Sequence, residues 1–500
     1  MHHLKAIRAV VLAIGVGMTA ACGDALDCIG AQCVPDQIYH GPLSAIDGHS
    51  PAQVTPVTMQ VGAYGWGAFD ADRPPERKPA SPHPVTFDKS YLEVNEQGLL
   101  FDPAQLQAVL DRIELLKDPK RPVFVFTYAH GWHHNARTPP VTAEADGLAY
   151  NAYKFDYFMA RFAEHVRRLY ELNSNDNAPI MLGVYVGWRG KSTTDPLAND
   201  INVGNRALAA DVIARKRGPG SLYDALKQIS DKLADSGPSA RMIATGHSLG
   251  GRLMSRMFLP EIAGGTLHPL GRQTLIAAIE PAISAACYDD IFAARETVGQ
   301  QGQLPSFIAI TSKDDVAVVD GFRFGHLAPT LDPPRCNENS PARNSAIGVY
   351  APYVTHFWEF KRKVAGDDIL PKTGCKPPEM QRDTGWLFKN GASLWQYPYF
   401  DPAGRCPTRG GNYHNAAWTY ELTVTRKEGY ARAGAVWNVQ TDRFLIDDAG
   451  DIGGDIGARH NGFSSTGLAD MLGRIAYAQI NWQDEGAGAT VPEPTAKTKP

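Results

Sequence analysis

A serine near the middle of the chain stands in a pattern that could make it a nucleophile. Ser248 lies within Gly246-His247-Ser248-Leu249-Gly250, between an apolar, strand-like segment and a segment with helical spacing of apolar residues. At such a strand-to-helix turn the serine hydroxyl is exposed beyond the end of the strand. A serine hydroxyl is a weak nucleophile by itself, so it needs a base and an acid that orients the base. The alternative is that Ser248 is only a small residue in a tight turn.

The segments around this motif alternate between strand and helix patterns. Asp102 and Ser221 stand where two of the helices should have their N-caps. Strands that alternate with helices predict an α/β fold, with a mostly parallel sheet covered by helices on both faces. The predicted strands cover 122–132, 179–188, 241–246, 274–281, 306–312 and 435–446, and the predicted helices include 103–117, 153–172, 221–234 and 468–480.

Together, the Gly-x-Ser-x-Gly motif and this alternation resemble the α/β-hydrolase superfamily, on its esterase and lipase side. The resemblance covers roughly residues 122–480. It implies an α/β-hydrolase fold and the chain order nucleophile, acid, base. It also implies hydrolysis of carboxylic esters through an acyl-enzyme, for which we expect neither a cofactor nor a metal.

The resemblance places the triad acid after the predicted strand 306–312. Lys313-Asp314-Asp315 follows that strand directly. We expect Asp315 to be the acid, because the superfamily has it a few residues beyond the strand and before a small apolar stretch. Asp314 is the alternative.

The base is expected on the loop after the last strand. His460 stands there, in front of the final predicted helix. Three other histidines are weaker alternatives. His326 follows Asp315 too closely to leave room for a strand. His356 lies in an apolar stretch that suits a core or a lid, and His414 lies in a Gly-rich loop.

The oxyanion of an acyl-transfer reaction needs two hydrogen-bond donors. The first is expected to be the backbone N–H of Leu249, directly after the nucleophile. The second is expected from the loop after an early strand, where Ala-His-Gly-Trp-His-His-Asn (129–135) resembles the His-Gly-x segment of lipases. The N–H of Trp132 is the best candidate, and His130 is expected to hold the loop by hydrogen bonds.

Two segments contain residue types that could suggest a metal site. His130, His133 and His134 could suggest zinc, but adjacent histidines do not easily share one ligand geometry and no acidic partner is spaced nearby. His133 or His134 is instead expected to line the pocket. The acidic glycine loop 447–457 could bind calcium through oxygen ligands, but its spacing is not that of an EF-hand.

A long insertion separates the predicted acid from the predicted base. The interval from 316 to 459 contains 144 residues (459 − 315 = 144), more than this superfamily often has. Much of it is rich in Pro, Gly and aromatic residues, so we expect a large irregular insertion between the last two strands, suited to a lid or cap.

The N-terminus predicts export. Basic residues, a short apolar run and small residues precede Cys22, which resembles a bacterial lipoprotein signal with Cys22 as the lipidated residue. An ordinary signal peptide is the alternative. Either signal puts the mature protein outside the cytosol, and the lipoprotein signal predicts a lipid anchor in the periplasm or outer membrane. The chain then divides into a signal (1–22), a tether and irregular N-terminal segment (23–84), a first part of the core (85–320), the Cys-containing insertion (321–430), the last strand and helix (431–483) and a disordered tail (484–500).

Composition agrees with an exported globular protein. The net charge is −4, which gives no general attraction for nucleic acid. Apart from Cys22, an even number of cysteines remains, which suits disulfides in an exported chain. Three of them fall in the insertion, so part of that region is expected to be stapled. The six are Cys28, Cys33, Cys287, Cys336, Cys375 and Cys406.

Several functions are compatible with these sequence features. The first hypothesis is an extracytoplasmic serine hydrolase acting on a small-molecule or lipid ester. A thioesterase, an amidase or an acyltransferase would use the same residues. A non-catalytic surface lipoprotein that uses the fold for binding is a different class, and so is an adhesion protein built on the insertion.

Overall fold

The structure is a computed structural model. It describes residues 50–61, 83–118, 120–132, 134, 136, 151–172, 177–190, 203–294, 305–315, 317–321, 336–364, 392–396, 418–426, 435–441, 460, 468–469 and 471–477. The predicted signal with Cys22, the acidic loop 447–457 and the tail 484–500 lie outside these residues. So do Cys28, Cys33, Cys375 and Cys406.

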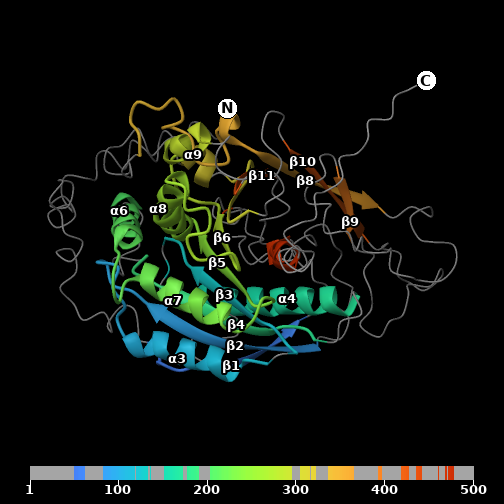
Figure 1. Cartoon of the computed structure of the whole chain (residues 1–500). Coiled ribbons are helices and arrows are strands. Elements are labelled where there is room, and N and C mark those ends of the chain that lie inside the picture. The colour runs from blue at the N-terminus through green and yellow to red at the C-terminus, as the bar shows by residue number, and fades with distance from the viewer. Residues whose placement is uncertain are drawn as a thin grey trace, which may run out of the picture.

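One eleven-stranded sheet forms the centre of the molecule (Figure 1). Its strands are β1 (Thr55–Val61), β2 (His83–Glu93), β3 (Val123–Ala129), β4 (Ile180–Gly187), β5 (Arg241–His247), β6 (Thr274–Ile279), β7 (Phe307–Ser312), β8 (His356–Val364), β9 (Ala392–Gln396), β10 (Trp418–Arg426) and β11 (Val436–Thr441). Their spatial order is β1-β2-β4-β3-β5-β6-β7-β11-β8-β10-β9. All neighbours from β2 to β8 are parallel, and only β1, β10 and β9 pair antiparallel. The predicted α/β class with a mostly parallel sheet is confirmed.

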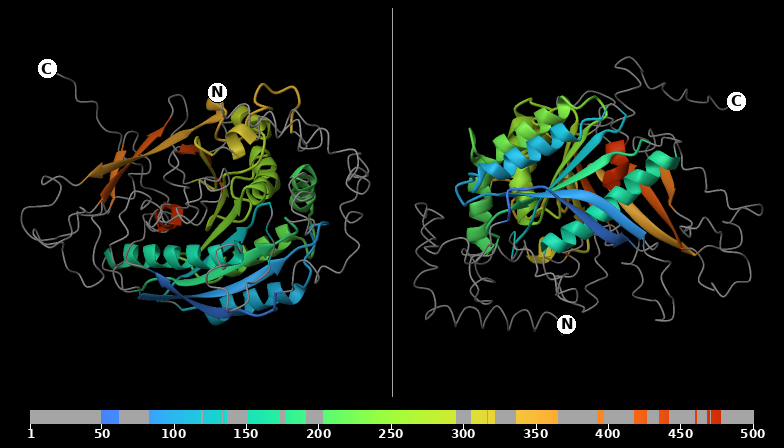
Figure 2. Two further views of the ribbon diagram at one scale, coloured as in Figure 1. Left: turned by 180° about the vertical axis from the view of Figure 1, so that it is seen from behind. Right: turned by 90° about the horizontal axis from the view of Figure 1, so that it is seen from below.

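Helices cover both faces of this sheet (Figure 2). One face carries α3 (Pro103–Leu115), α6 (Val203–Arg215), α7 (Leu222–Ala234) and α8 (Leu249–Ala263). The other carries α4 (Asn151–Leu172) and the helical residues 468–469 and 471–477. Shorter elements are η5 (Ala285–Tyr288), α9 (Asp289–Ala293), the π-helical turn η6 (Ala317–Gly321) and η7 (Ala351–Tyr353). None of the helices within the described ranges is both long and apolar enough to span a bilayer.

Strand β3 shows why its sequence is mostly apolar. Val123 and Val125 belong to the core under α3, α6, α7 and α8, whereas Phe124 and Phe126 belong to the core under α4. The ring of Phe126 lies 4.9 Å from that of Phe158 on α4. Successive side chains of a strand point to opposite faces, so a strand covered on both sides is apolar at every position.

The predicted helix starts are confirmed. The Asp102 carboxylate accepts a hydrogen bond from the Ala104 N–H at 2.9 Å, and the Ser221 hydroxyl accepts one from the Asp224 N–H at 3.1 Å. Each satisfies a backbone donor that the first helical turn leaves without an acceptor, so local sequence suffices to set these boundaries.

Two segments contain elements that the sequence patterns did not predict. Strands β8, β9 and β10 lie within the insertion 321–430, where they extend the sheet beyond β11. Strand β1 lies within 23–84, and β2 and α6 were also missed. In β8 buried Trp358 alternates with half-buried Phe357 and exposed Glu359, a strand pattern that the surrounding Pro and Gly residues obscure.

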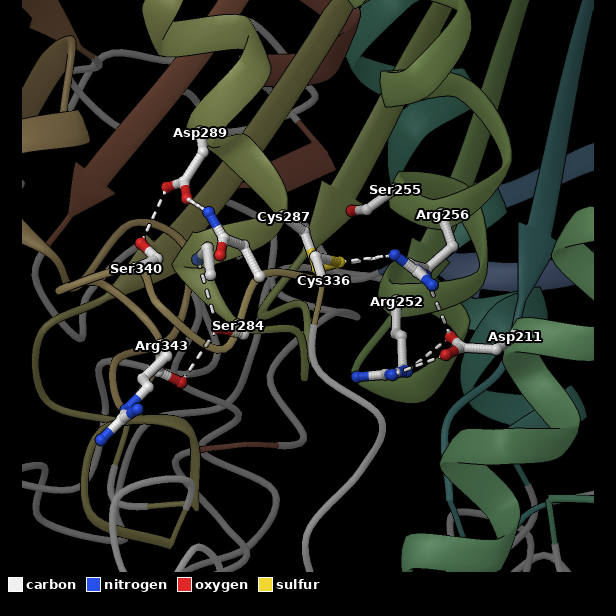
Figure 3. The surroundings of a disulfide bond; sticks show 12 residues. Asp211, Arg252, Ser255, Arg256, Ser284, Cys287, Asp289, Cys336, Ser340 and Arg343 are labelled. Atoms are coloured by element: carbon white, nitrogen blue, oxygen red, sulfur yellow. Dashed lines mark hydrogen bonds and ion pairs between the residues drawn. A yellow bond between two sulfur atoms is a disulfide. The ribbon is translucent and has the colours of Figure 1, made fainter. Parts of the chain in front are cut away.

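The start of the insertion is fastened to the core by a disulfide (Figure 3). Cys287 in η5 is bonded to Cys336, with 4.8 Å between their Cα atoms. The Arg256 guanidinium of α8 lies against the Cys336 sulfur. The expected stapling of the insertion therefore involves a partner in the core. Asp289 adds hydrogen bonds from the Tyr353 and Ser340 hydroxyls, at 2.6 and 3.0 Å.

The disulfide generates a stability prediction. The double variant C287S/C336S is expected to lose about 2–4 kcal/mol of unfolding free energy, because the bond closes a loop 49 residues long in the unfolded chain. Urea unfolding under oxidising conditions measures this. A reductant should destabilise the wild-type protein more than the variant, in which this disulfide is already absent. Equal midpoints for both proteins under oxidising conditions would contradict the prediction.

Candidate active site

The carboxyl ends of the central parallel strands meet at one edge of the sheet. The register pairs Ala129 with Gly246, His247 with Ile279, and Ser312 with Thr441. The segments that leave β3, β5, β6, β7 and β11 therefore begin side by side. In open α/β sheets this edge is where ligands bind.

Ser248 occupies a strained turn at this edge. Its φ of 55° and ψ of −117° are unusual for a residue with a side chain. Its backbone is fixed on both sides, since its N–H donates to Ile279 O at 2.9 Å and its carbonyl accepts from the N–H groups of Arg252 and Ala282. It directly precedes α8, yet its side chain makes no capping hydrogen bond to that helix. The hydroxyl is thus available for another partner.

The two glycines of the motif are required by close packing. A Cβ at Gly246 would overlap the backbone of Gly250, and a Cβ at Gly250 would overlap the carbonyl oxygen of Ala129. Glycine alone lets the turn fold back on itself and lie against the end of β3.

A chain of hydrogen bonds joins Ser248, His460 and Asp315. The His460 Nε2 lies 2.8 Å from the Ser248 Oγ, and its Nδ1 lies 2.7 Å from the Asp315 Oδ2. An imidazole that donates from Nδ1 to the carboxylate can accept the serine proton at Nε2. Ser248 is 5% exposed, the side chain of His460 is 15% exposed and Asp315 is fully buried, so the carboxylate lies deepest of the three groups. The structure brings together the three residues expected from the sequence.

Asp315 is held rigidly as an acceptor. Its Oδ1 accepts hydrogen bonds from the N–H groups of Ala317 and Val318, at 2.9 and 3.1 Å, where η6 begins. Burial by itself would raise the pKa of Asp315. The charge and hydrogen bond of His460 outweigh burial, with help from further hydrogen bonds, and hold that pKa below its ordinary value. Asp314, the alternative acid, is half-buried, and its N–H bonds to the hydroxyl of Ser312.

His247, the residue before the serine, was not expected to have a role. Its Nε2 lies 2.6 Å from the backbone carbonyl of His460, to which it can donate a hydrogen bond. Burial lowers the pKa of His247 to about 3, and the charge of His460 adds to this effect. The neutral ring thus ties the backbone of His460 to the end of β5. The signal in the sequence was its place within the Gly-x-Ser-x-Gly motif.

Glu280 is a second acid that the sequence prediction did not assign. It directly follows strand β6 and is fully buried with a φ of 44°. Its Oε1 accepts a hydrogen bond from the Ser312 N–H at 2.8 Å, and its carboxyl group is in hydrogen-bonding contact with that of Asp315. Burial raises the pKa of Glu280 well above its usual range, and the charge of Asp315 raises it further. An acidic residue ending an apolar strand was the available signal.

The first expected oxyanion donor follows the nucleophile in the chain, and the residue before the second approaches the nucleophile in space. Leu249 is the first residue of α8, where backbone N–H groups have no acceptor within the helix. A Cβ built on Gly131 would be 2.9 Å from the Cβ of Ser248, so the 130–132 segment passes directly against the nucleophile. Trp132, the other expected donor, is half-buried at this point and packs on the core.

His130 holds this segment in place. Its Nε2 accepts a hydrogen bond from the Trp188 N–H at 3.1 Å, so the neutral ring carries its proton on Nδ1 and donates to the Gly131 carbonyl at 2.9 Å. The ring stacks on that of Trp188 with a centroid distance of 5.6 Å. Burial lowers the pKa of His130 to about 4. This arrangement agrees with the loop-holding role expected from the sequence.

The structure describes two of the other histidines that were considered as candidates. His356 is buried on β8, with its ring 4.3 Å from that of Trp437, and is a core residue. His134 lies edge-on to His130. His133, His326 and His414 lie outside the described residues. Among the residues that are described, no group of three or more His, Cys, Asp or Glu side chains is arranged to hold a metal ion.

Comparison with known proteins adds little to this geometry. No protein-family model matches the sequence, and no characterised protein matches it. A crystal structure of a poly(3-hydroxybutyrate) depolymerase from Bordetella parapertussis is 13% identical. The match covers 55% of this chain and 70% of that one, with a TM-score of 0.19. A likeness of that size carries no argument about function.

The close approach of Gly131 to Ser248 predicts the effect of adding one methyl group. In G131A the new Cβ must push against the Ser248 side chain, so reaction of the serine with an acylating or phosphonylating probe is expected to slow on the order of tenfold or more. The labelling rate of folded protein measures this. G264A is the control, because Gly264 has an ordinary φ and a distant place at the end of α8. Equal rates for G131A and wild type would contradict the prediction.

The two buried neutral histidines predict a loss of stability in mild acid. Their folded pKa values are below the ordinary value of 6.5, so between pH 6.5 and about 4 the unfolded chain binds protons that the folded chain does not. The unfolding free energy should therefore fall with decreasing pH, by roughly 1.4 kcal/mol per unit for each histidine. Urea unfolding of wild type and H130Q from pH 7 to 4.5 measures the slope. H130Q should show the shallower slope, and parallel curves would rule the explanation out.

Proposed function

We propose that the chain is a serine hydrolase of the α/β-hydrolase type that cleaves carboxylic esters. Ser248 is the nucleophile, His460 the general base and acid, and Asp315 the residue that orients His460. The observation that carries the proposal is the continuous chain of hydrogen bonds from Ser248 through His460 to Asp315, at 2.8 and 2.7 Å. Both distances are within the range in which a proton can be transferred directly.

The first half of the reaction forms an acyl-enzyme. The Ser248 Oγ attacks the carbonyl carbon of the ester while its proton passes to the Nε2 of His460. The imidazolium that forms is stabilised by the carboxylate of Asp315, which keeps its hydrogen bond to Nδ1 and stays ionised. The tetrahedral intermediate then collapses, and His460 donates the proton to the departing alkoxide oxygen.

The second half regenerates the serine. Water gives a proton to His460 as its oxygen attacks the acyl carbon, and the carboxylic acid leaves as Ser248 recovers its proton. In both halves the negative charge on the carbonyl oxygen is stabilised by the N–H groups of Leu249 and Trp132. Donors held in advance by α8 and by His130 need no rearrangement when the charge develops.

The substrate class and the location of the protein rest on the sequence. The resemblance favours carboxylic esters over thioesters and amides, although the same residues could act on all three. The signal-like segment that ends at Cys22 favours export and lipid anchoring in the periplasm or outer membrane. A small-molecule or lipid ester near that membrane is the proposed substrate.

Fluorophosphonate labelling of the purified full-length protein tests the proposal, alongside hydrolysis of p-nitrophenyl butyrate. S248A and H460A should lose labelling, and their kcat should fall on the order of 10⁴-fold or more, because the residues of a triad act as a unit. D315N should also be strongly impaired. Ser255 lies on the same helix α8 and hydrogen-bonds only to the backbone of Gly251, so S255A serves as the control and should behave as wild type.

The opposite result would favour a different function. If the folded wild-type protein neither labels nor hydrolyses the ester, Ser248 is not an activated nucleophile. A protein that binds ligands without catalysis would then be the better hypothesis.

A further inference from the structure

Two buried acids lie in contact behind the proposed base. Glu280 and Asp315 come from the ends of adjacent strands, β6 and β7, and both are fully buried. Two carboxyl groups in contact within a buried site cannot both be ionised, so one of them keeps a proton. Their hydrogen-bond partners show which one it is.

Asp315 has the partners of an anion. It accepts hydrogen bonds from Ala317, Val318 and His460. Glu280 accepts only one, from the Ser312 N–H to its Oε1. Apart from the contact with Asp315, its buried Oε2 has no hydrogen-bond partner. The proton therefore belongs on Glu280, where it can be shared with the Asp315 carboxylate.

The other charged groups nearby agree with this assignment. Asp315 is the only charged side chain that acts on Glu280 within the described part of the chain. From β5, His247 faces Asp315 and His460, but it is neutral because of its burial. Within the described ranges, no lysine or arginine acts on Glu280.

The backbone of Glu280 indicates that its position is specific. A positive φ at a residue with a side chain costs on the order of 1–3 kcal/mol and persists where the surroundings require it. Its N–H is bonded to Ile310 O at 2.8 Å, which holds this conformation against β7. The strained backbone places an acid, in an otherwise apolar strand, against the proposed triad.

We propose that Glu280, as a neutral carboxylic acid, is a positioning residue that donates a hydrogen bond to Asp315 and thereby tunes how strongly Asp315 stabilises a positive charge on His460. The inference rests on the proposed function. A hydrogen bond to the carboxylate draws off part of its negative charge, so the carboxylate stabilises the imidazolium form of His460 less. Without this donor, the acid limb of the pH profile should move to higher pH.

Two variants distinguish the role of Glu280 as a hydrogen-bond donor from the role of its side chain in filling space. E280M has an apolar side chain of similar length and cannot donate, whereas E280Q is neutral and can donate through its amide while accepting from Ser312. The measurement is the pH dependence of kcat and KM for p-nitrophenyl butyrate, with urea unfolding to verify the fold. E261Q is the control, because Glu261 lies near the end of α8 and pairs with Arg217 there.

In E280M the acid limb of kcat/KM should move up by about 0.5–1 pH unit. In E280Q the limb should stay within about 0.3 unit of wild type, and any shift should be upward. The control should coincide with wild type. A side chain that only fills space would lower stability without moving the acid limb.

The sign of the change in E280Q tests the proposal even if E280M does not fold. Were Glu280 ionised, E280Q would remove a negative charge and move the acid limb downward, which would overturn the proposal. An unmoved limb in folded, active E280M would overturn it as well. A failure of the proposed function has a different result, since wild type itself would then neither label nor hydrolyse the ester.

Discussion

The hydrogen bond between His460 and the buried carboxylate of Asp315 is the interaction on which the rest of the site depends. It joins residues 145 positions apart, and only a sheet that brings the ends of β7 and β11 together can form it. Neighbouring groups hold each of the two residues that form this hydrogen bond. The N–H groups at the start of η6 hold the carboxylate, and His247 holds the backbone of the imidazole.

Burial, more than residue type, decides the charge of the groups around this contact. Three buried titratable side chains at this edge of the sheet are neutral because water is excluded. His130 and His247 serve as fixed donors of hydrogen bonds, and Glu280 retains a proton beside Asp315. The negative charge is thereby confined to one carboxylate, directly behind the proposed base. Neighbouring ionisable groups whose pKa values are shifted in opposite directions are common where proton transfer takes place.

The described parts of the insertion have a structural role. Strand β8 joins β11 in parallel, and the disulfide between Cys287 and Cys336 ties the segment before it to η5. Residues 283–285 exchange backbone hydrogen bonds with 345–347, just after the strained Glu280. The described parts of the insertion therefore support the same edge that carries the site.

The sequence by itself determined the α/β class, the helix caps and the identity of the residues at the proposed triad, because these depend on local patterns. A strand covered on both faces is apolar throughout, and a nucleophile at a sharp turn needs its glycines. Only the tertiary structure decided the partners of Glu280 and His247 and the strands hidden in the insertion. Those depend on contacts between segments distant in the chain, where burial changes the protonation of a side chain and a neighbouring strand supplies the hydrogen bonds that its own sequence does not encode.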